Sequence, residues 1–221
     1  MARRIALTLL VLSTFTGTAL AAHSREPQKR HNPADQARAS MIRIFRNDLG
    51  AGDWRVEAAG QETDSLGGCT YPDMSDLVET GKVENPNFSR NGSYVGSEGE
   101  VWATARDAET SWQRSLRFPF GACLTRALKQ ALGNDPRVKL TVLSSGPLRT
   151  AKLAPRTFAY RMSFRVKGAA ATITGRMTVY AFMRGRVDAS LLVMSFSRPL
   201  QPVPLGVEQR LARVLAARVS R

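Results

Sequence analysis

The sequence predicts a single α+β domain in which helices pack on an antiparallel sheet. Segments with the alternating apolar pattern of strands are grouped together between residues 138 and 197. Lys167-Gly168 and Arg184-Gly185 form short turns between consecutive strand segments, and turns this tight join antiparallel neighbours. The helical patterns lie before and after the strands instead of alternating with them, which is typical of α+β proteins.

The first half of the domain is predicted to begin with a helix from about Pro33 to Leu49. Gly52-Asp53-Trp54 is predicted to form a turn whose tryptophan side chain fills a space in the fold. Residues 55–76 are predicted to be a long acidic loop rich in Gly, Asp and Pro. Two strands follow, Val78–Val83 and Ser93–Ala103, separated by turn-prone Asn, Pro and Gly residues.

Two helices are predicted in the middle of the chain. Thr104 is a suitable N-cap for the first of them, with Asp107 three residues later. The second runs from about Pro119 to Leu132, with proline in its first turn and Gly133 at its end. Cys123 lies on the apolar side of this helix.

The second half is predicted to be mostly strand, followed by a final helix with an apolar stripe. The strands are Val138–Leu148, Phe158–Lys167, Thr172–Arg184 and Val187–Ser197, and the helix is Pro204–Val219. The clean alternation of the Phe158 strand favours one face against helices and one face nearer water.

The first 21 residues have the features of a cleaved export signal. Arg3 and Arg4 precede an apolar stretch of about 16 residues, which is shorter than the roughly 20 residues that span a bilayer. Ala19-Leu20-Ala21 is a small-x-small cleavage site. The prediction is a signal peptide (1–21), a flexible leader (22–33) and one domain (34–221), secreted or associated with the cell envelope. The alternative is an uncleaved anchor.

The two cysteines, Cys69 and Cys123, are expected to form one structural disulfide, because an exported chain folds in an oxidising compartment. In the loop-entropy model such a bond stabilises the fold by roughly 4 kcal/mol. A metal site or a reactive thiol is the alternative, but there is no CxxC spacing and no nearby histidine.

The composition excludes several kinds of catalysis and gives no sign of a cofactor. His23 and His31 both lie in the leader, so no Ser-His or Cys-His pair can form inside the domain, and no metal site is expected. Glu98 and Glu100 share one face of a predicted strand, where paired carboxylates could serve an envelope-acting hydrolase. The favoured interpretation is that they meet arginines on a neighbouring strand, so no catalytic residue is assigned.

The charge is unevenly divided along the chain. Residues 22–109 hold 10 Lys/Arg and 15 Asp/Glu, whereas residues 110–221 hold 20 Lys/Arg and 3 Asp/Glu. A possible anion-binding patch on the predicted sheet consists of Arg161, Arg165, Arg176, Arg184 and Arg186. The alternative is that these arginines only make one face of the sheet polar toward solvent and bind no ligand. Nucleic acid is not expected as a partner, because the strands lack exposed aromatic runs between the basic residues.

Several short segments resemble secreted actinobacterial proteins of unknown function. They are Ala34–Ala37 (ADQA), Asp48–Trp54 (DLGAGDW), Cys69 before Pro72–Leu77 (PDMSDL), Ser97–Trp102 (SEGEVW), Cys123-Leu124 and Arg156–Arg161 (RTFAYR). The layout is also distantly similar to the extracellular sensor domains of mycobacterial receptor kinases and to PsbP/Mog1-like lipoproteins. That resemblance implies an antiparallel sheet flanked by helices and a binding role. This chain has one cysteine pair and no kinase segment, so signalling is not implied.

These observations favour a non-enzymatic binding module of the cell envelope or the medium. Its ligand would be an apolar small molecule held between sheet and helices, or an envelope polyanion or anionic lipid held by arginines. A pocket lined by Met162, Phe164, Met177 and Val179 would favour the apolar small molecule. A filled interior with arginines on the outside would favour the polyanion or anionic lipid. The alternatives are the hydrolase that uses Glu98 or Glu100 and a structural protein that docks a partner.

Overall fold

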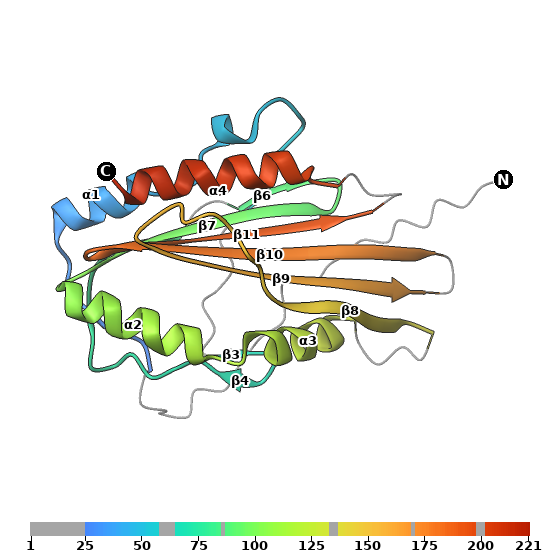
Figure 1. Cartoon of the computed structure of the whole chain (residues 1–221), viewed down its shortest axis with the longest axis horizontal. Helices are drawn as coiled ribbons and strands as arrows, with labels where there is room; N and C mark the ends of the chain where they lie inside the picture. The colour runs from blue at the N-terminus through green and yellow to red at the C-terminus, as the bar shows by residue number, and fades with distance from the viewer. Residues whose placement is uncertain (1–24, 58–64, 85–86, 133–136, 169–170, 198–201) are drawn as a thin grey trace.

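A long, twisted sheet runs the length of the molecule, with helices on both of its faces (Figure 1). The computed structural model describes residues 25–57, 65–84, 87–132, 137–168, 171–197 and 202–221. The helices of the described residues are α1 (Pro33–Met41), α2 (Ala105–Arg117), α3 (Phe120–Ala131) and α4 (Leu205–Val219), with a 3-10 turn η1 (Arg46–Leu49). None of these helices is long and apolar enough to span a membrane.

The strands form a nine-stranded sheet and a separate two-stranded ribbon. The main path of the large sheet is β1-β5-β7-β11-β10-β9-β8, with β2 and β6 paired beside β7, and the ribbon is β3-β4. Their bounds are β1 (Gln28–Lys29), β2 (Arg55–Glu57), β3 (Ser65–Leu66), β4 (Cys69–Thr70), β5 (Val78–Glu84), β6 (Asn87–Arg90), β7 (Ser93–Trp102), β8 (Lys139–Pro147), β9 (Arg156–Lys167), β10 (Thr172–Arg184) and β11 (Val187–Phe196).

The predicted α+β class is confirmed. Strands β8, β9, β10 and β11 pair in chain order as an antiparallel meander, and β11 then pairs with β7 from the first half of the chain. All the strand pairs of the large sheet are antiparallel except β1 with β5. The connections from Lys167 to Thr172 and from Arg184 to Val187 are short, which sets the antiparallel topology that the sequence predicted.

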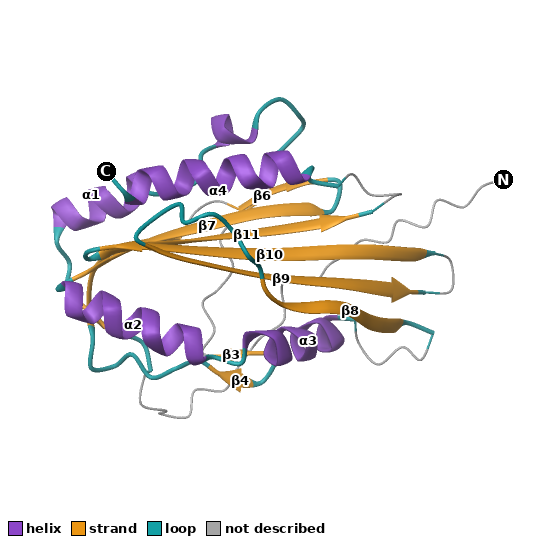
Figure 2. Ribbon diagram, in the orientation of Figure 1, coloured by secondary structure: helices purple, strands orange, loops and turns teal. Residues whose placement is uncertain are grey.

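Helix α4 covers one face of the sheet, together with α1 (Figure 2). The core on this side contains Leu211 and Leu215 of α4, Phe182 of β10 and Leu191 of β11, all less than 1% exposed. Burial of large apolar side chains is the main stabilising contribution to such a layer. The sequence predicted that one of the two faces of β9 lies nearer water. Instead, helices cover both faces, because α4 lies across this one.

Helices α2 and α3 cover the opposite face. Trp102 and Trp112 pack together beside Met183, and Leu124 of α3 packs on Met162 of β9. The predicted disulfide joins Cys69 of β4 to Cys123 of α3, which ties the small ribbon to this layer. The three tryptophans are at most 8% exposed and belong to the core on the two faces of the sheet.

Two glycines allow α1 to approach the sheet closely. A Cβ atom on Gly81 of β5 would lie 2.5 Å from the carbonyl carbon of Asp35, and one on Gly99 of β7 would lie 2.6 Å from Ile42 Cγ1. Neither distance is compatible with a real side chain, so these positions require glycine for the observed packing.

The structure differs from the sequence prediction mainly in residues 22–76. The first helix ends at Met41 instead of Leu49, because Ile42 and Ile44 enter the core and the Ile44 amide donates to Ser97 Oγ at 2.8 Å. The expected long loop contains β2, β3 and β4. Within the expected leader, Gln28–Lys29 form β1, and the export signal itself lies outside the described residues, as does Gly133.

Candidate functional site

Two of the five predicted anion-binding arginines bind a buried carboxylate of the protein itself. Arg161 Nη2 lies 2.5 Å from Glu208 Oε1, and Arg176 Nη2 lies 3.2 Å from Glu208 Oε2. The Tyr180 hydroxyl also donates to Glu208, at 2.9 Å. Glu208 is 0% exposed, so α4 brings one carboxylate to two strand arginines beneath it. Burial, followed by the Glu208 charge, raises the pKa of Tyr180 to about 12.

The other three predicted arginines are separate from this group. Arg186 binds Asp35 of α1, with Nη2 at 3.0 Å from Oδ1. Arg184 donates to the carbonyl oxygen of Ser220 beyond α4, and Arg165 is exposed on β9. The structure therefore brings Arg161 and Arg176 together, but it does not gather all five arginines into one patch.

Glu98 and Glu100 meet a lysine, not the arginines that the sequence favoured. Lys82 Nζ lies 2.8 Å from Glu98 Oε1 and 3.3 Å from Glu100 Oε1, because the three residues lie on the neighbouring strands β5 and β7. Asp188 of β11 is the register partner of Glu100 and is hydrogen bonded to it. Asp188 Oδ2 also accepts from Trp102 Nε1 at 2.8 Å.

Burial dominates the electrostatics of this carboxyl pair. It raises the pKa of Glu100 to about 8, with a further contribution from the charge of Asp188. Burial likewise raises the pKa of Asp188 to about 7. One shared proton therefore stays on the pair near neutral pH, and Glu100 donates to Asp188 while it holds that proton.

The apolar interior is filled where a small ligand was considered. Met162, Phe164 and Met177 are at most 6% exposed and pack against Leu124 of α3. No three His, Cys, Asp or Glu side chains of the described residues are grouped so that they could hold a metal ion.

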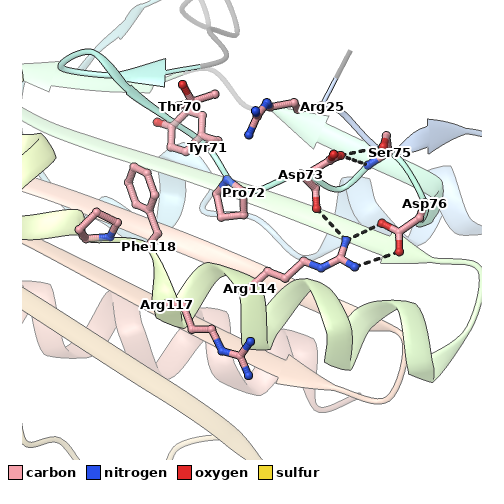
Figure 3. A pocket seen from close by; sticks show the side chains of 11 residues that line it. Arg25, Thr70, Tyr71, Pro72, Asp73, Ser75, Asp76, Arg114, Arg117 and Phe118 are labelled. Carbon is pink, nitrogen blue, oxygen red and sulfur yellow. Dashed lines mark hydrogen bonds and ion pairs between the residues drawn. The ribbon is translucent and has the colours of Figure 1, made fainter. Parts of the chain in front are cut away.

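An open pocket of about 670 Å³ lies where the loop after β4 meets the end of α2 (Figure 3). Its aromatic part is formed by Tyr71 and Phe118, whose ring centroids are 5.1 Å apart. The pocket is lined by Arg25, Thr70, Tyr71, Pro72, Asp73, Ser75, Asp76, Arg114, Arg117, Phe118 and Pro119.

Arginine Arg114 of α2 anchors the pocket loop. Its guanidinium forms a two-pronged ion pair with Asp76, at 2.5 and 2.9 Å, and also donates to the Asp73 carbonyl oxygen at 2.7 Å (Figure 3). This contact with Arg114 holds the pKa of Asp76 below its usual value. The Asp73 carboxylate accepts from the Ser75 amide and hydroxyl, at 3.0 and 2.7 Å.

Two further arginines lie at the rim of the pocket and are exposed. Arg25 is joined to the pocket loop through its carbonyl oxygen, which accepts from the Met74 amide at 2.8 Å. Arg117 is in the last turn of α2, next to Phe118. The pocket thus combines an aromatic surface with two cations that no carboxylate binds directly among the described residues.

Sequence reasoning did not find this pocket. Residues 55–76 were predicted to be a long acidic loop, and its described acids Glu57, Asp73 and Asp76 are exposed. The signal that was available is the disulfide: Cys69 lies two residues before Tyr71, and Cys123 lies five residues after Phe118, so their bond brings the two rings close. The pairing of Asp76 with Arg114 depends on a tertiary contact that the sequence pattern does not contain.

The comparison with solved structures supports the fold. The chain is similar to the extracellular domain of PknH from Mycobacterium tuberculosis, with a TM-score of 0.50 and 12% sequence identity over 87% of this chain and 100% of that domain. This agrees with the distant likeness to extracellular sensor domains that the layout suggested. No family model matches the chain, and no curated protein matches it.

Proposed function

We propose that this chain is an exported, non-enzymatic binding module whose ligand occupies the pocket between Tyr71 and Arg117. The ligand would carry an anionic group beside a flat ring or sugar face. The single observation that carries this proposal is the pocket itself, in which paired aromatic rings lie beside exposed arginines. The fold similarity to an extracellular domain supports the location and a binding role.

The chemistry of the lining selects the ligand class. Aromatic side chains bind flat or apolar ligand faces, and tyrosine keeps a polar group for orientation. Arginine binds phosphate or carboxylate with paired hydrogen bonds. The ion pair with Arg114 offsets the charge of Asp76, whereas Asp73, which accepts from Ser75, keeps its charge and is offset by the charge of Arg25.

The competing functions have less support. An apolar ligand within the core would need the space that Met162, Phe164 and Met177 already fill. A hydrolase based on Glu98 or Glu100 would need a substrate cleft at these residues, but they bind Lys82 and do not line the pocket.

Titration with phenyl phosphate tests the proposal, because this probe joins a ring to a dianion. We expect it to bind more tightly than inorganic phosphate or phenol, as measured by calorimetry. Tyr71→Ala should reduce the affinity for phenyl phosphate to that for phosphate. The double variant Arg25→Gln/Arg117→Gln should weaken binding about tenfold or more, since a hydrogen bond to a charged group contributes roughly 1.5 to 3 kcal/mol.

The control is Arg106→Gln/Lys129→Gln, which removes the same charge from exposed sites on α2 and α3 outside the pocket. It should bind phenyl phosphate as the parent chain does. Equal loss in both double variants, or equal affinity for phenyl phosphate and inorganic phosphate, would contradict the proposed pocket.

A further inference from the structure

The outer surface around α4 is strongly basic. We define the α4 face as six arginines on α4, on the segment between α1 and η1, and at the end of the chain: Arg43, Arg46, Arg210, Arg213, Arg218 and Arg221. Arg210, Arg213 and Arg221 point away from the core and are exposed. The one acid within α4 is Glu208, which is buried against the sheet, so α4 adds no negative charge to this surface.

Direct contacts bring these arginines together. Arg218 binds Asp48 of η1, with distances of 2.6 and 2.9 Å, and Arg210 donates to the Asp48 carbonyl oxygen at 3.0 Å. Arg218 also donates to the carbonyl oxygen of Arg43. Asp48 is thus already paired, and the charge of the remaining arginines is not balanced by it.

Apolar side chains are exposed within the same surface. Phe45 lies between two guanidinium groups, with the Cζ atoms of Arg43 and Arg218 each 4.8 Å from its ring centroid, and it is 36% exposed. Met41, at the end of α1, is 67% exposed. An aromatic ring between arginines, with an exposed aliphatic side chain nearby, is suited to the interface of a lipid bilayer.

We propose that the α4 face docks on the surface of an anionic lipid bilayer. The arginines would lie at the headgroup phosphates, and Met41 and Phe45 would enter the boundary between headgroups and acyl chains. A soluble polyanion would use the arginines alone, so the exposed apolar pair favours the bilayer.

The fold gives this docking a consequence for orientation. Helix α4 covers one face of the sheet, whereas α2, which contributes Arg114 and Arg117 to the pocket, covers the other (Figure 1). A chain docked through α4 would therefore hold its pocket on the side away from the bilayer. The docking surface does not depend on the ligand proposed for that pocket.

Co-sedimentation with vesicles tests the proposal. The parent chain should bind vesicles of phosphatidylglycerol mixed with phosphatidylcholine and should not bind pure phosphatidylcholine. Binding should fall steeply between about 0.1 M and about 1 M salt, because the Debye length shortens from about 10 Å to about 3 Å. Arg213→Gln/Arg221→Gln should weaken partitioning about 25-fold, at roughly fivefold per arginine.

Three comparisons make the result decisive. Arg106→Gln/Lys129→Gln, on the opposite face, should leave vesicle binding unchanged. Every variant carries the same residues 1–24, so a difference between variants does not come from that segment. Met41→Ser should weaken binding to anionic vesicles but not to dextran sulfate.

Absence of binding to anionic vesicles would overturn the proposal, and so would equal loss in the two double variants. Binding to dextran sulfate as tight as to vesicles, with no effect of Met41→Ser, would replace the bilayer by a soluble polyanion.

Discussion

At the scale of single residues, Glu208 is a buried charged group that connects α4 to the strands of the sheet. It is fully buried and accepts contacts from Arg161, Arg176 and Tyr180. A buried carboxylate is tolerable only when such partners compensate for its lost hydration. Both arginines are about one quarter exposed, which lessens the cost of burying the group.

Replacement of Glu208 by glutamine should therefore destabilise the fold by about 3 kcal/mol, since it leaves two arginines without their counter-charge. Urea denaturation would measure this change. Glu109→Gln is a suitable comparison, because its partner Arg156 is 52% exposed and such a surface pair contributes at most about 1 kcal/mol. Similar costs for both variants would contradict the role of Glu208.

The Glu100–Asp188 pair predicts how stability depends on pH. The folded pKa of Glu100, about 8, lies above the value of 4.5 for an unperturbed glutamate, so between these values the folded state holds more protons. Stability should then fall as pH rises through this window, and level off above it. The raised pKa of Asp188, about 7, has the same sign.

Glu100→Gln mimics the protonated side chain and should reduce this fall. At about pH 9 the variant should be more stable than the parent chain by roughly 1 to 2 kcal/mol, and at about pH 4 the two should be similar. The Glu100 side chain is 20% exposed and lies beside Lys82, so part of the shift is screened. Glu98→Gln should keep the fall in stability with rising pH. If this variant lost that pH dependence, the Glu100–Asp188 pair would not be its source.

At the scale of elements, α1 packs closely on the sheet because two strand residues beneath it have no side chain. Gly81 and Gly99 let Asp35 and Ile42 approach strands β5 and β7. Gly81→Ala should destabilise the protein by about 2 kcal/mol or more, because the new Cβ meets the backbone of α1, which cannot move aside alone. Thermal unfolding would measure the loss.

Gly146 of β8 provides the control for this prediction. A Cβ atom there meets nothing within 4 Å, and its backbone is in a strand. Gly146→Ala should therefore change the unfolding temperature little. If both alanine variants behaved alike, close packing of α1 would not be what fixes glycine at position 81.

The sequence predicted elements best where the chain is locally regular. The alternation in β9 and the short connections that follow Lys167 and Arg184 specify the meander without any distant contact. Residues 42–76 were less predictable, because Ile44 and Trp54 take part in the core through tertiary contacts that interrupt regular structure. The pocket joins this part of the chain to Arg25 and to the end of α2, and no local pattern in the sequence indicates contacts between such distant segments.

At the scale of the whole molecule, the uneven charge of the chain is partly used inside the fold. Ion pairs between described residues join the acidic first half to the basic second half, among them Asp35–Arg186, Asp48–Arg218, Asp76–Arg114 and Glu109–Arg156. The uneven charge along the chain therefore reflects ion pairs within the molecule as well as any external partner. The excess of arginine that remains lies partly on α4, where Arg210 and Arg213 are exposed, and partly on the strands, where Arg165 is exposed.

The disulfide is the covalent counterpart of these cross-half contacts. Cys69→Ser/Cys123→Ser should lower the free energy of unfolding by roughly 4 kcal/mol in the loop-entropy model. It should also weaken phenyl phosphate binding, because β4 and α3 position Tyr71 and Phe118. Calorimetry of parent and variant gives both quantities; unchanged values would show that noncovalent packing alone aligns the two rings.

The position of Glu208 within α4 also bears on how the domain reaches its final state. Until this last helix docks, the two arginines beneath it have no buried partner, and Leu191 and Phe182 lack their cover. This side of the core therefore stays open to water in any state in which α4 has not docked, so its closure requires that residues 205–219 have been synthesised.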